Sequence, residues 1–133
     1  MRKFCAALLF YLGLASAALA QSFPIPASTI QIPIAGTVAA STRIVTGVAG
    51  RQIIVTAVFQ IPVATSVVTY TYGTGTNCGT GTASVTGALT FGAGQILEIG
   101  NGYGGIFILP QGVDLCITIV TAAAPGSLAY TLF

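Results

Sequence analysis

From residue 52 to the C-terminus, short runs of β-branched and aromatic residues alternate with glycine, proline and asparagine. The clearest run, 52–60 (QIIVTAVFQ), has the two-residue period of a β-strand. Strict alternation would give this strand two faces, one with Ile53, Val55, Ala57 and Phe59 and the other with Ile54, Thr56 and Val58. Both faces are mostly apolar, so we expect the strand to lie in the centre of a sandwich or under another subunit.

Further segments of the same kind predict shorter strands. In 66–74, Val68, Tyr70 and Tyr72 share a face, and in 114–121 the shared residues are Leu115, Ile117 and Ile119. The other candidate strands are 82–90, 95–100, 105–109 and 127–133. About seven or eight short strands, with no helical period of useful length, predict an all-β fold. We expect residues 37–133 to form a single antiparallel β-sandwich or jelly-roll-like domain.

The segment 21–36 differs from the rest of the chain. Pro24, Pro26 and Pro33 cannot donate to a central ladder, which predicts an extended proline-rich arm or an edge strand. The alternation of Ile30, Ile32 and Ile34 still suits a segment lying against a sheet. We expect the arm to pack on its own domain, and packing on a neighbouring copy is the alternative.

The first 20 residues have the three zones of a secretory signal peptide. Residues 1–3 form a short positive region with Arg2 and Lys3, 4–15 are apolar, and 18–20 read Ala-Leu-Ala, a small-x-small cleavage pattern. The alternative, a membrane anchor, needs about 20 unbroken apolar residues, and this core is shorter. The pattern predicts cleavage after residue 20 and an exported protein, periplasmic or extracellular, with no membrane span after cleavage.

Charge is scarce, and most of the apparent basic bias lies in the predicted signal. The chain has four Lys and Arg residues, two Asp and Glu residues and no histidine. Removing Arg2 and Lys3 leaves Arg43, Arg51, Glu98 and Asp114, so the side-chain net charge becomes zero. Two arginines cannot neutralise the roughly 6–10 phosphates of a DNA contact set, which excludes a nucleic-acid partner. Near-zero net charge favours association with other proteins.

Two cysteines remain after the predicted cleavage removes Cys5. An even pair in an exported protein predicts a disulfide between Cys78 and Cys116. In the chain-entropy model, closing this loop of about 38 residues contributes about 4 kcal/mol. The alternative is two unpaired thiols. Two sulfurs without histidine cannot complete a tetrahedral zinc site, and the sequence has no C-x-x-C redox motif.

Few side chains suited to catalysis are present. The absence of histidine excludes a Ser-His-Asp triad, and a pair of catalytic carboxylates would have to be Glu98 and Asp114. We expect Asp114 to cap a turn and Glu98 to point into solvent. The Gly-Thr run 73–82 and the glycine-rich segment 100–105 lack the lysine and the following helix of phosphate-binding loops. The sequence therefore predicts a protein that is not an enzyme and that has no cofactor or metal.

Three tyrosines are candidates for surface contact. Tyr70, Tyr72 and Tyr103 could form a platform on which a sugar stacks. Tyrosines in strands more often contribute to packing, and no polar cluster surrounds these three in the sequence. Glycan binding through them is therefore an alternative hypothesis.

A series of short motifs suggests a family. They are Ile44-Val45, 48–53, Asn77-Cys78-Gly79, 86–89, Leu109-Pro110 with Gly112, 115–117 and 126–130. With these motifs, about 90 residues resemble small β-sandwich proteins of tailed-phage and prophage structural modules and related environmental viral sequences. The resemblance implies a non-enzymatic module that is associated with a virion or displayed on a surface.

Together these features predict a structural protein that acts through protein–protein contact. The partner is expected to be a second copy or another structural protein. The alternative is an exported adhesin or glycan-binding module that uses its loops and tyrosines.

Overall fold

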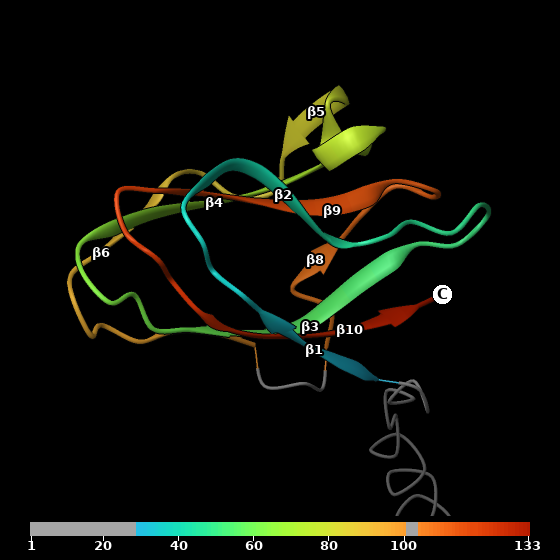
Figure 1. The fold of residues 1–133 in the computed structure, drawn as a ribbon. Helices are drawn as coiled ribbons and strands as arrows, with labels where there is room; N and C mark the ends of the chain where they lie inside the picture. Colours follow the sequence, from blue (N-terminus) through green and yellow to red (C-terminus); the bar gives the residue numbers. More distant parts are fainter. Residues whose placement is uncertain (1–28, 101–103) are drawn as a thin grey trace, which may run out of the picture.

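The computed structural model describes residues 29–100 and 104–133, and Figure 1 shows two sheets lying one above the other. Every strand pairing is antiparallel. The described residues are therefore all-β, and the predicted β-sandwich is confirmed. The predicted signal peptide and residues 21–28 of the predicted arm lie outside the described residues.

The first sheet, called the β3 sheet after its central strand, contains five strands. Their order is β1 (Ile30–Ile34), β10 (Gly126–Leu132), β3 (Ile53–Gln60) and β7 (Leu97–Ile99), and β8 (Phe107–Ile108) also pairs with β3. Strands β7 and β8 pair with β3 at different heights: β7 lies opposite 58–60 and β8 opposite 54–55. Together they occupy one edge position.

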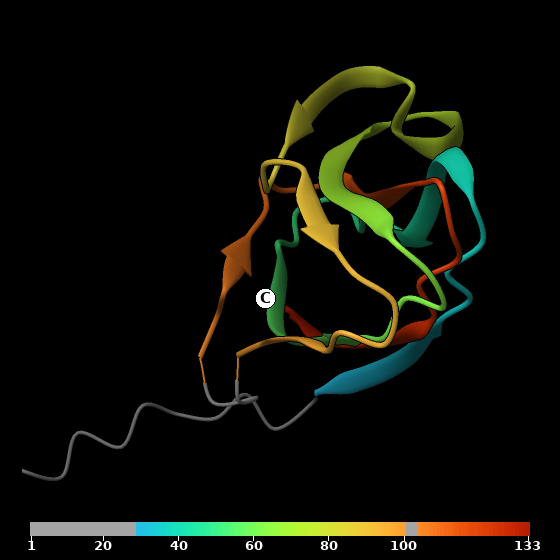
Figure 2. The ribbon, with the colours of Figure 1, turned by 90° about the vertical axis from the view of Figure 1, so that its left-hand side faces the viewer.

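The second sheet, called the β4 sheet, has the same plan. Its order is β2 (Ala39–Val45), β9 (Asp114–Val120), β4 (Ser66–Thr74) and β5 (Thr80–Ser84), and β6 (Leu89–Phe91) also pairs with β4. A short 3₁₀ helix, η1 (Thr76–Cys78), joins β4 to β5. Counting β5 with β6 and β7 with β8 gives eight strand positions in two four-position sheets, with the chain passing between the sheets as in a jelly roll. Figure 2 views this arrangement from the side.

The predicted strands match the observed ones, with two differences. The segment 82–90 contains parts of two strands, β5 and β6, because the chain leaves the ladder around Gly87. The strand β2 was not predicted, since its sequence AASTRIV is small and polar and lacks a clear apolar period. It lies at the edge of its sheet, where such a sequence is tolerated.

The core fills the space between the inner faces of the two sheets. The residues predicted to share a face in 66–74 and 114–121 do so: Val68 and Tyr70 lie opposite Ile119 and Ile117, and all four are buried. From the β3 sheet, Ile53, Val55, Val58 and Leu128 meet them. One cluster of buried aliphatic side chains thus joins the two sheets.

The alternation predicted for 52–60 is wrong beyond Val55. Tyr130 pairs with Val55 while the preceding Ala129 pairs with Ala57, so Thr56 is an extra residue, a β-bulge. The Oγ1 of Thr56 donates to the carbonyl of Ala129 at 3.2 Å. The bulge reverses the faces: Val58 and Gln60 enter the core, and Ala57 and Phe59 move to the outer surface of the sheet.

The described part of the predicted arm forms β1. It pairs with β10 of the same chain, from Ile30 opposite Tyr130 to Ile34 opposite Gly126. Ile34 is buried, and Pro33 lies in an edge strand, where its missing N–H leaves no gap in a central ladder.

Candidate functional site

The outer face of the β3 sheet carries large exposed apolar side chains. Pairing across the strands places Ile54 beside Ile108, Ala57 beside Ala129, and Phe59 between Ser127 and Glu98. Glu98 is the charged residue that the pairing places on this face. Gln31 and Ser127 lie on the same face, because they pair with Ala129 and Phe59. The unusual feature for an antiparallel sheet that meets water is therefore its large exposed apolar side chains.

Five exposed apolar residues define what we call the apolar patch. They lie on the outer face of the β3 sheet and on the loops that continue it, and their exposed fractions are: Phe59 39%, Ile61 37%, Val63 67%, Ile96 61% and Ile108 64%. Ile61 directly follows β3 and Ile96 directly precedes β7, at the end of the sheet where Gln60 pairs with Leu97. Clustered exposed apolar side chains, unlike scattered ones, mark interaction surfaces.

Backbone hydrogen bonds fix the loops that carry part of this patch. The N–H of Ile61 donates to the carbonyl of Pro125 at 3.0 Å, and that of Val63 donates to Ala123 at 3.0 Å. The N–H of Gly94 donates to Pro62 at 2.9 Å. Three loops are thereby tied together at the left-hand end of the molecule in Figure 1. These backbone hydrogen bonds hold the loops that carry the side chains of Ile61, Val63 and Ile96.

The outer face of the β4 sheet has a different character. Pairing places Thr69 beside Thr118, Thr71 beside Ser84 and Val67 beside Thr90. The hydroxyl of Thr118 also donates to the carbonyl of Ala40 at 2.7 Å, linking β9 to the edge strand β2. Thr69, Thr90 and Thr118 give this face several hydroxyl groups, although Thr71 is buried and the exposed Val120 lies beside Val67.

A disulfide closes one end of the β4 sheet's outer face. Cys78 in η1 is bonded to Cys116 in β9, with the Cα atoms 6.2 Å apart, and both residues are buried. This confirms the predicted pairing. The same loop bonds to β2, because the Oγ of Ser41 donates to the carbonyl of Asn77 at 2.8 Å and the N–H of Arg43 to its Oδ1 at 3.2 Å.

The two carboxylates considered as a catalytic pair lie in different sheets. Asp114 is 8% exposed, and it accepts from the N–H of Gly47 at 2.7 Å and from Arg43 Nη1 at 3.3 Å. Both of its oxygens are thus engaged in holding β2 and the following loop to β9. Glu98 is exposed on β7 in the β3 sheet. Asp114 therefore has a structural role.

Two of the three candidate contact tyrosines belong to the interior. Tyr70 is wholly buried, so its prediction as a surface contact is wrong, and Tyr72 is half-buried and packs against the core. Both face inward because they follow Val68 at two-residue spacing on β4. Tyr103 lies outside the described residues.

Tyr70 instead belongs to a buried polar network. Its hydroxyl donates to Oε1 of Gln60 at 2.6 Å, and Nε2 of Gln60 donates to the carbonyl of Ala124 at 2.7 Å. Burial raises the pKa of Tyr70 well above its ordinary value. The network joins the two sheets. Sequence reasoning did not find it, because the bulge at Thr56 is what brings Gln60 inside.

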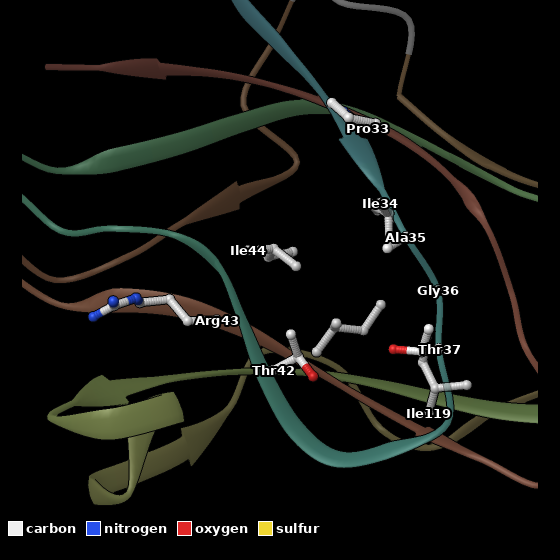
Figure 3. Close-up of a pocket in the computed structure, with 10 residues that line it drawn as sticks. Pro33, Ile34, Ala35, Gly36, Thr37, Thr42, Arg43, Ile44 and Ile119 are labelled. Atoms are coloured by element: carbon white, nitrogen blue, oxygen red, sulfur yellow. The ribbon is translucent and has the colours of Figure 1, made fainter.

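A small pocket of about 180 Å³ lies where the chain passes from β1 to β2 (Figure 3). Aliphatic side chains, among them Ile34, Ile44 and Ile119, line most of it. In Figure 3 the guanidinium of Arg43 points away from these side chains. Gly36 permits the crossing with φ +65°, and a Cβ there would lie 2.3 Å from the backbone of Ala124. The pocket is a consequence of this crossing.

Across 29–100 and 104–133, no three His, Cys, Asp or Glu side chains gather in a group that could hold a metal ion. In the same part of the chain, no helix has the length and apolarity that crossing a membrane requires.

Comparisons with protein families, curated proteins and solved structures gave no match to this chain. The resemblance to phage structural modules therefore stays a prediction from the sequence motifs.

Proposed function

We propose that the protein is a non-enzymatic structural subunit that acts through protein–protein contact. It is exported and is part of a virion or of a surface-displayed assembly. The outer face of the β3 sheet is its contact surface. The observation that carries this proposal is the apolar patch.

The energetics of the patch support this role. Burying exposed aliphatic surface stabilises a contact by about 25 cal/mol per Å². Phe59, Ile61, Val63, Ile96 and Ile108 each retain more than a third of their surface. The described residues carry two positive and two negative side chains, so little electrostatic repulsion opposes the approach of a partner. Burying these side chains against a partner would therefore be more favourable than leaving them in water.

The fold and the disulfide are compatible with this proposal. Disulfides persist in oxidising compartments, which agrees with export. Jelly rolls form both viral shells and carbohydrate-binding domains, so the fold by itself does not choose between them. The choice rests on the surface. Glycan binding through the tyrosines has weaker support, because Tyr70 and Tyr72 point into the core.

The proposal is tested in the organism that encodes the protein. The gene would be replaced by an allele that encodes Ile96→Asp or Thr90→Asp. Cultures would then be fractionated into medium, envelope and sedimentable particles, and the protein located in each fraction. Ile96 lies in the apolar patch, whereas Thr90 is an exposed strand residue on the other sheet. The unaltered protein and Thr90→Asp should be found in large assemblies on a sucrose gradient, and Ile96→Asp should sediment slowly.

Thr90→Asp controls for the added charge. The proposed contact surface would be wrong if Ile96→Asp assembled as well as the unaltered protein. The proposed function would be wrong if the unaltered protein were found in no assembly.

A further inference from the structure

We propose that the pocket between β1 and β2 binds a small neutral molecule that has an aliphatic body and a hydroxyl or carbonyl group at one end. The pocket is separate from the apolar patch, so this inference goes beyond the proposed function and does not depend on it. The class of ligand follows from the walls of the pocket, from its volume and from the polar groups beside it.

The walls of the pocket come from both sheets. Ile34 is supplied by β1 of the β3 sheet. Three other isoleucines, Ile44, Ile117 and Ile119, are supplied by β2 and β9 of the β4 sheet. Ile34, Ile117 and Ile119 are buried, and Ile44 packs against the same core. The aliphatic part of a ligand would therefore make dispersion contacts with branched side chains on several sides.

The volume of the pocket limits the size of the ligand. Pockets that hold drug-sized molecules have volumes of roughly 300–1,000 Å³. The pocket beside β1 has a volume of about 180 Å³. An engineered cavity of about 150 Å³, lined by leucine, isoleucine and phenylalanine in another protein, binds benzene. We therefore expect a ligand of about six to eight non-hydrogen atoms, slightly larger than benzene.

Two threonine hydroxyls lie beside the pocket. Thr42 is on β2, and Thr37 is in the crossing between β1 and β2, residues 35–38. In Figure 3 the oxygen atoms of these two side chains are turned toward each other. Thr37 is exposed and Thr42 is half-buried, so this is the part of the pocket that meets solvent. A threonine hydroxyl both donates and accepts, and each can bond to the polar end of a ligand.

The charge of the pocket selects against ionised ligands. Among the described residues that line it, Arg43 is the charged one. Its guanidinium points away from the isoleucines in Figure 3 and pairs with Asp114 at 3.3 Å. A carboxylate or an ammonium group that entered the pocket would lose hydration without gaining a counter-ion. The site should therefore prefer neutral molecules.

The crossing that closes the pocket is held in place by the rest of the fold. The N–H of Ala124 donates to the carbonyl of Gly36 at 2.8 Å. The two backbones approach so closely that a side chain on Gly36 would overlap Ala124. Because the crossing is fixed in this way, the pocket exists before a ligand arrives. Binding then costs little ordering of the chain.

The experiment uses 1-hexanol as the probe and isoleucine methyl NMR as the readout, on the protein purified after expression of the full chain. Titration should shift the methyl signals of Ile34, Ile44, Ile117 and Ile119 to saturation. The methyl of Ile108, on the apolar patch, is the control and should shift little. Sodium hexanoate and hexylammonium chloride should each bind at least about tenfold more weakly than 1-hexanol, because they are charged.

Substitutions at Thr42 separate the polar and the apolar parts of the site. Thr42→Val removes the hydroxyl and keeps the shape, so it should weaken 1-hexanol by about three- to tenfold. It should leave binding of 1-chloropentane, a neutral probe of similar size without a hydroxyl, unchanged. Thr42→Leu should fill the pocket and weaken both probes by more than about tenfold. Thr90→Val, on the outer face of the β4 sheet, is the matched control and should bind like the unaltered protein. Thermal melts check that each variant folds.

The proposal is overturned if 1-hexanol shifts none of the four pocket isoleucines, or shifts only Ile108. It is equally overturned if hexanoate or hexylammonium binds as tightly as 1-hexanol, or if Thr42→Leu binds both neutral probes like the unaltered protein. Equal weakening of 1-hexanol and 1-chloropentane in Thr42→Val would contradict the bond to the ligand's hydroxyl.

Discussion

The outer faces of the two sheets differ although the sheets have the same plan. The β4 sheet presents threonine and serine hydroxyls together with Val67 and the exposed Val120, and a disulfide-bonded loop covers one end of it. The β3 sheet presents alanine, isoleucine and phenylalanine together with Gln31, Ser127 and Glu98. Packing of the two sheets against each other requires each to have an apolar inner face. It does not require the outer face of either sheet to be apolar. Under the proposed function, the outer face of the β4 sheet meets water and that of the β3 sheet meets a partner.

The largest expected effect on stability comes from removing the disulfide that holds the loop over one end of the β4 sheet. The double variant Cys78→Ala/Cys116→Ala should lose about 4 kcal/mol of unfolding free energy, because the bond closes a loop with a sequence separation of 38. Urea denaturation followed by circular dichroism measures this loss. Thr76→Ala, an exposed change in the same loop, should have little effect. Equal stability of the double variant and the unaltered protein would contradict the role assigned to the disulfide.

The second effect concerns the network that joins the sheets behind both outer faces. Tyr70→Phe leaves the Oε1 of Gln60 buried without its donor, which should cost about 1–3 kcal/mol. The same urea experiment measures it. Tyr72→Phe, at the half-buried tyrosine two residues later, is the matched control and should cost less. An unchanged free energy of unfolding in Tyr70→Phe would show that the hydrogen bond contributes nothing to stability.

The same hydroxyl predicts a dependence on alkaline pH. Burial raises the pKa of Tyr70 in the folded state above its value near 10 in the unfolded chain. Above pH 10 the unfolded state therefore releases a proton that the folded state keeps, and stability falls as the pH rises. The fall should approach about 1.4 kcal/mol per pH unit. Urea denaturation between pH 8 and 11 should show a steeper decline for the unaltered protein than for Tyr70→Phe.

The smallest effects on stability are expected when the outer face of the β3 sheet is made more polar and that of the β4 sheet more apolar. Ile108→Thr on the β3 sheet and Thr90→Ile on the β4 sheet change exposed or edge positions, and each should alter stability by about 0.5 kcal/mol or less. Their effects on solubility should be opposite. Precipitation with ammonium sulfate should occur at a higher salt concentration for Ile108→Thr and at a lower one for Thr90→Ile. A shift in the same direction for both would deny that the faces differ.

Much of this fold could be predicted from the sequence, because its long strands follow a two-residue period. Residues 66–74 and 114–121 have regular alternation, and their inward faces were predicted correctly. The extra residue at Thr56 was not predictable, since a bulge depends on the partner strand and leaves the local pattern unchanged. Prediction therefore placed Phe59 with Val55, whereas the structure places it on the outer surface.

The candidate site was predictable only in outline. The apolar character of both faces of 52–60 predicted a strand at the centre of a sandwich or under another subunit. In the structure β3 has neighbouring strands on both sides, and its outer residue Phe59 is exposed. The tyrosines were misleading, because exposure depends on which face of β4 meets the core. The apolar patch combines residues from β3, β8 and two loops, and only the packing of the chain brings them to one side.

One measurement compares the two faces within a single sample. In a protein labelled at isoleucine and threonine methyl groups, a soluble paramagnetic probe reports the accessibility of each methyl by NMR as the protein concentration rises. Our account predicts that Ile61, Ile96 and Ile108 lose accessibility with concentration, while Thr69, Thr90 and Thr118 keep theirs. Constant accessibility of the isoleucines would contradict self-association through the β3 sheet, and protection of the threonines instead would contradict the claim that this sheet presents the contact surface.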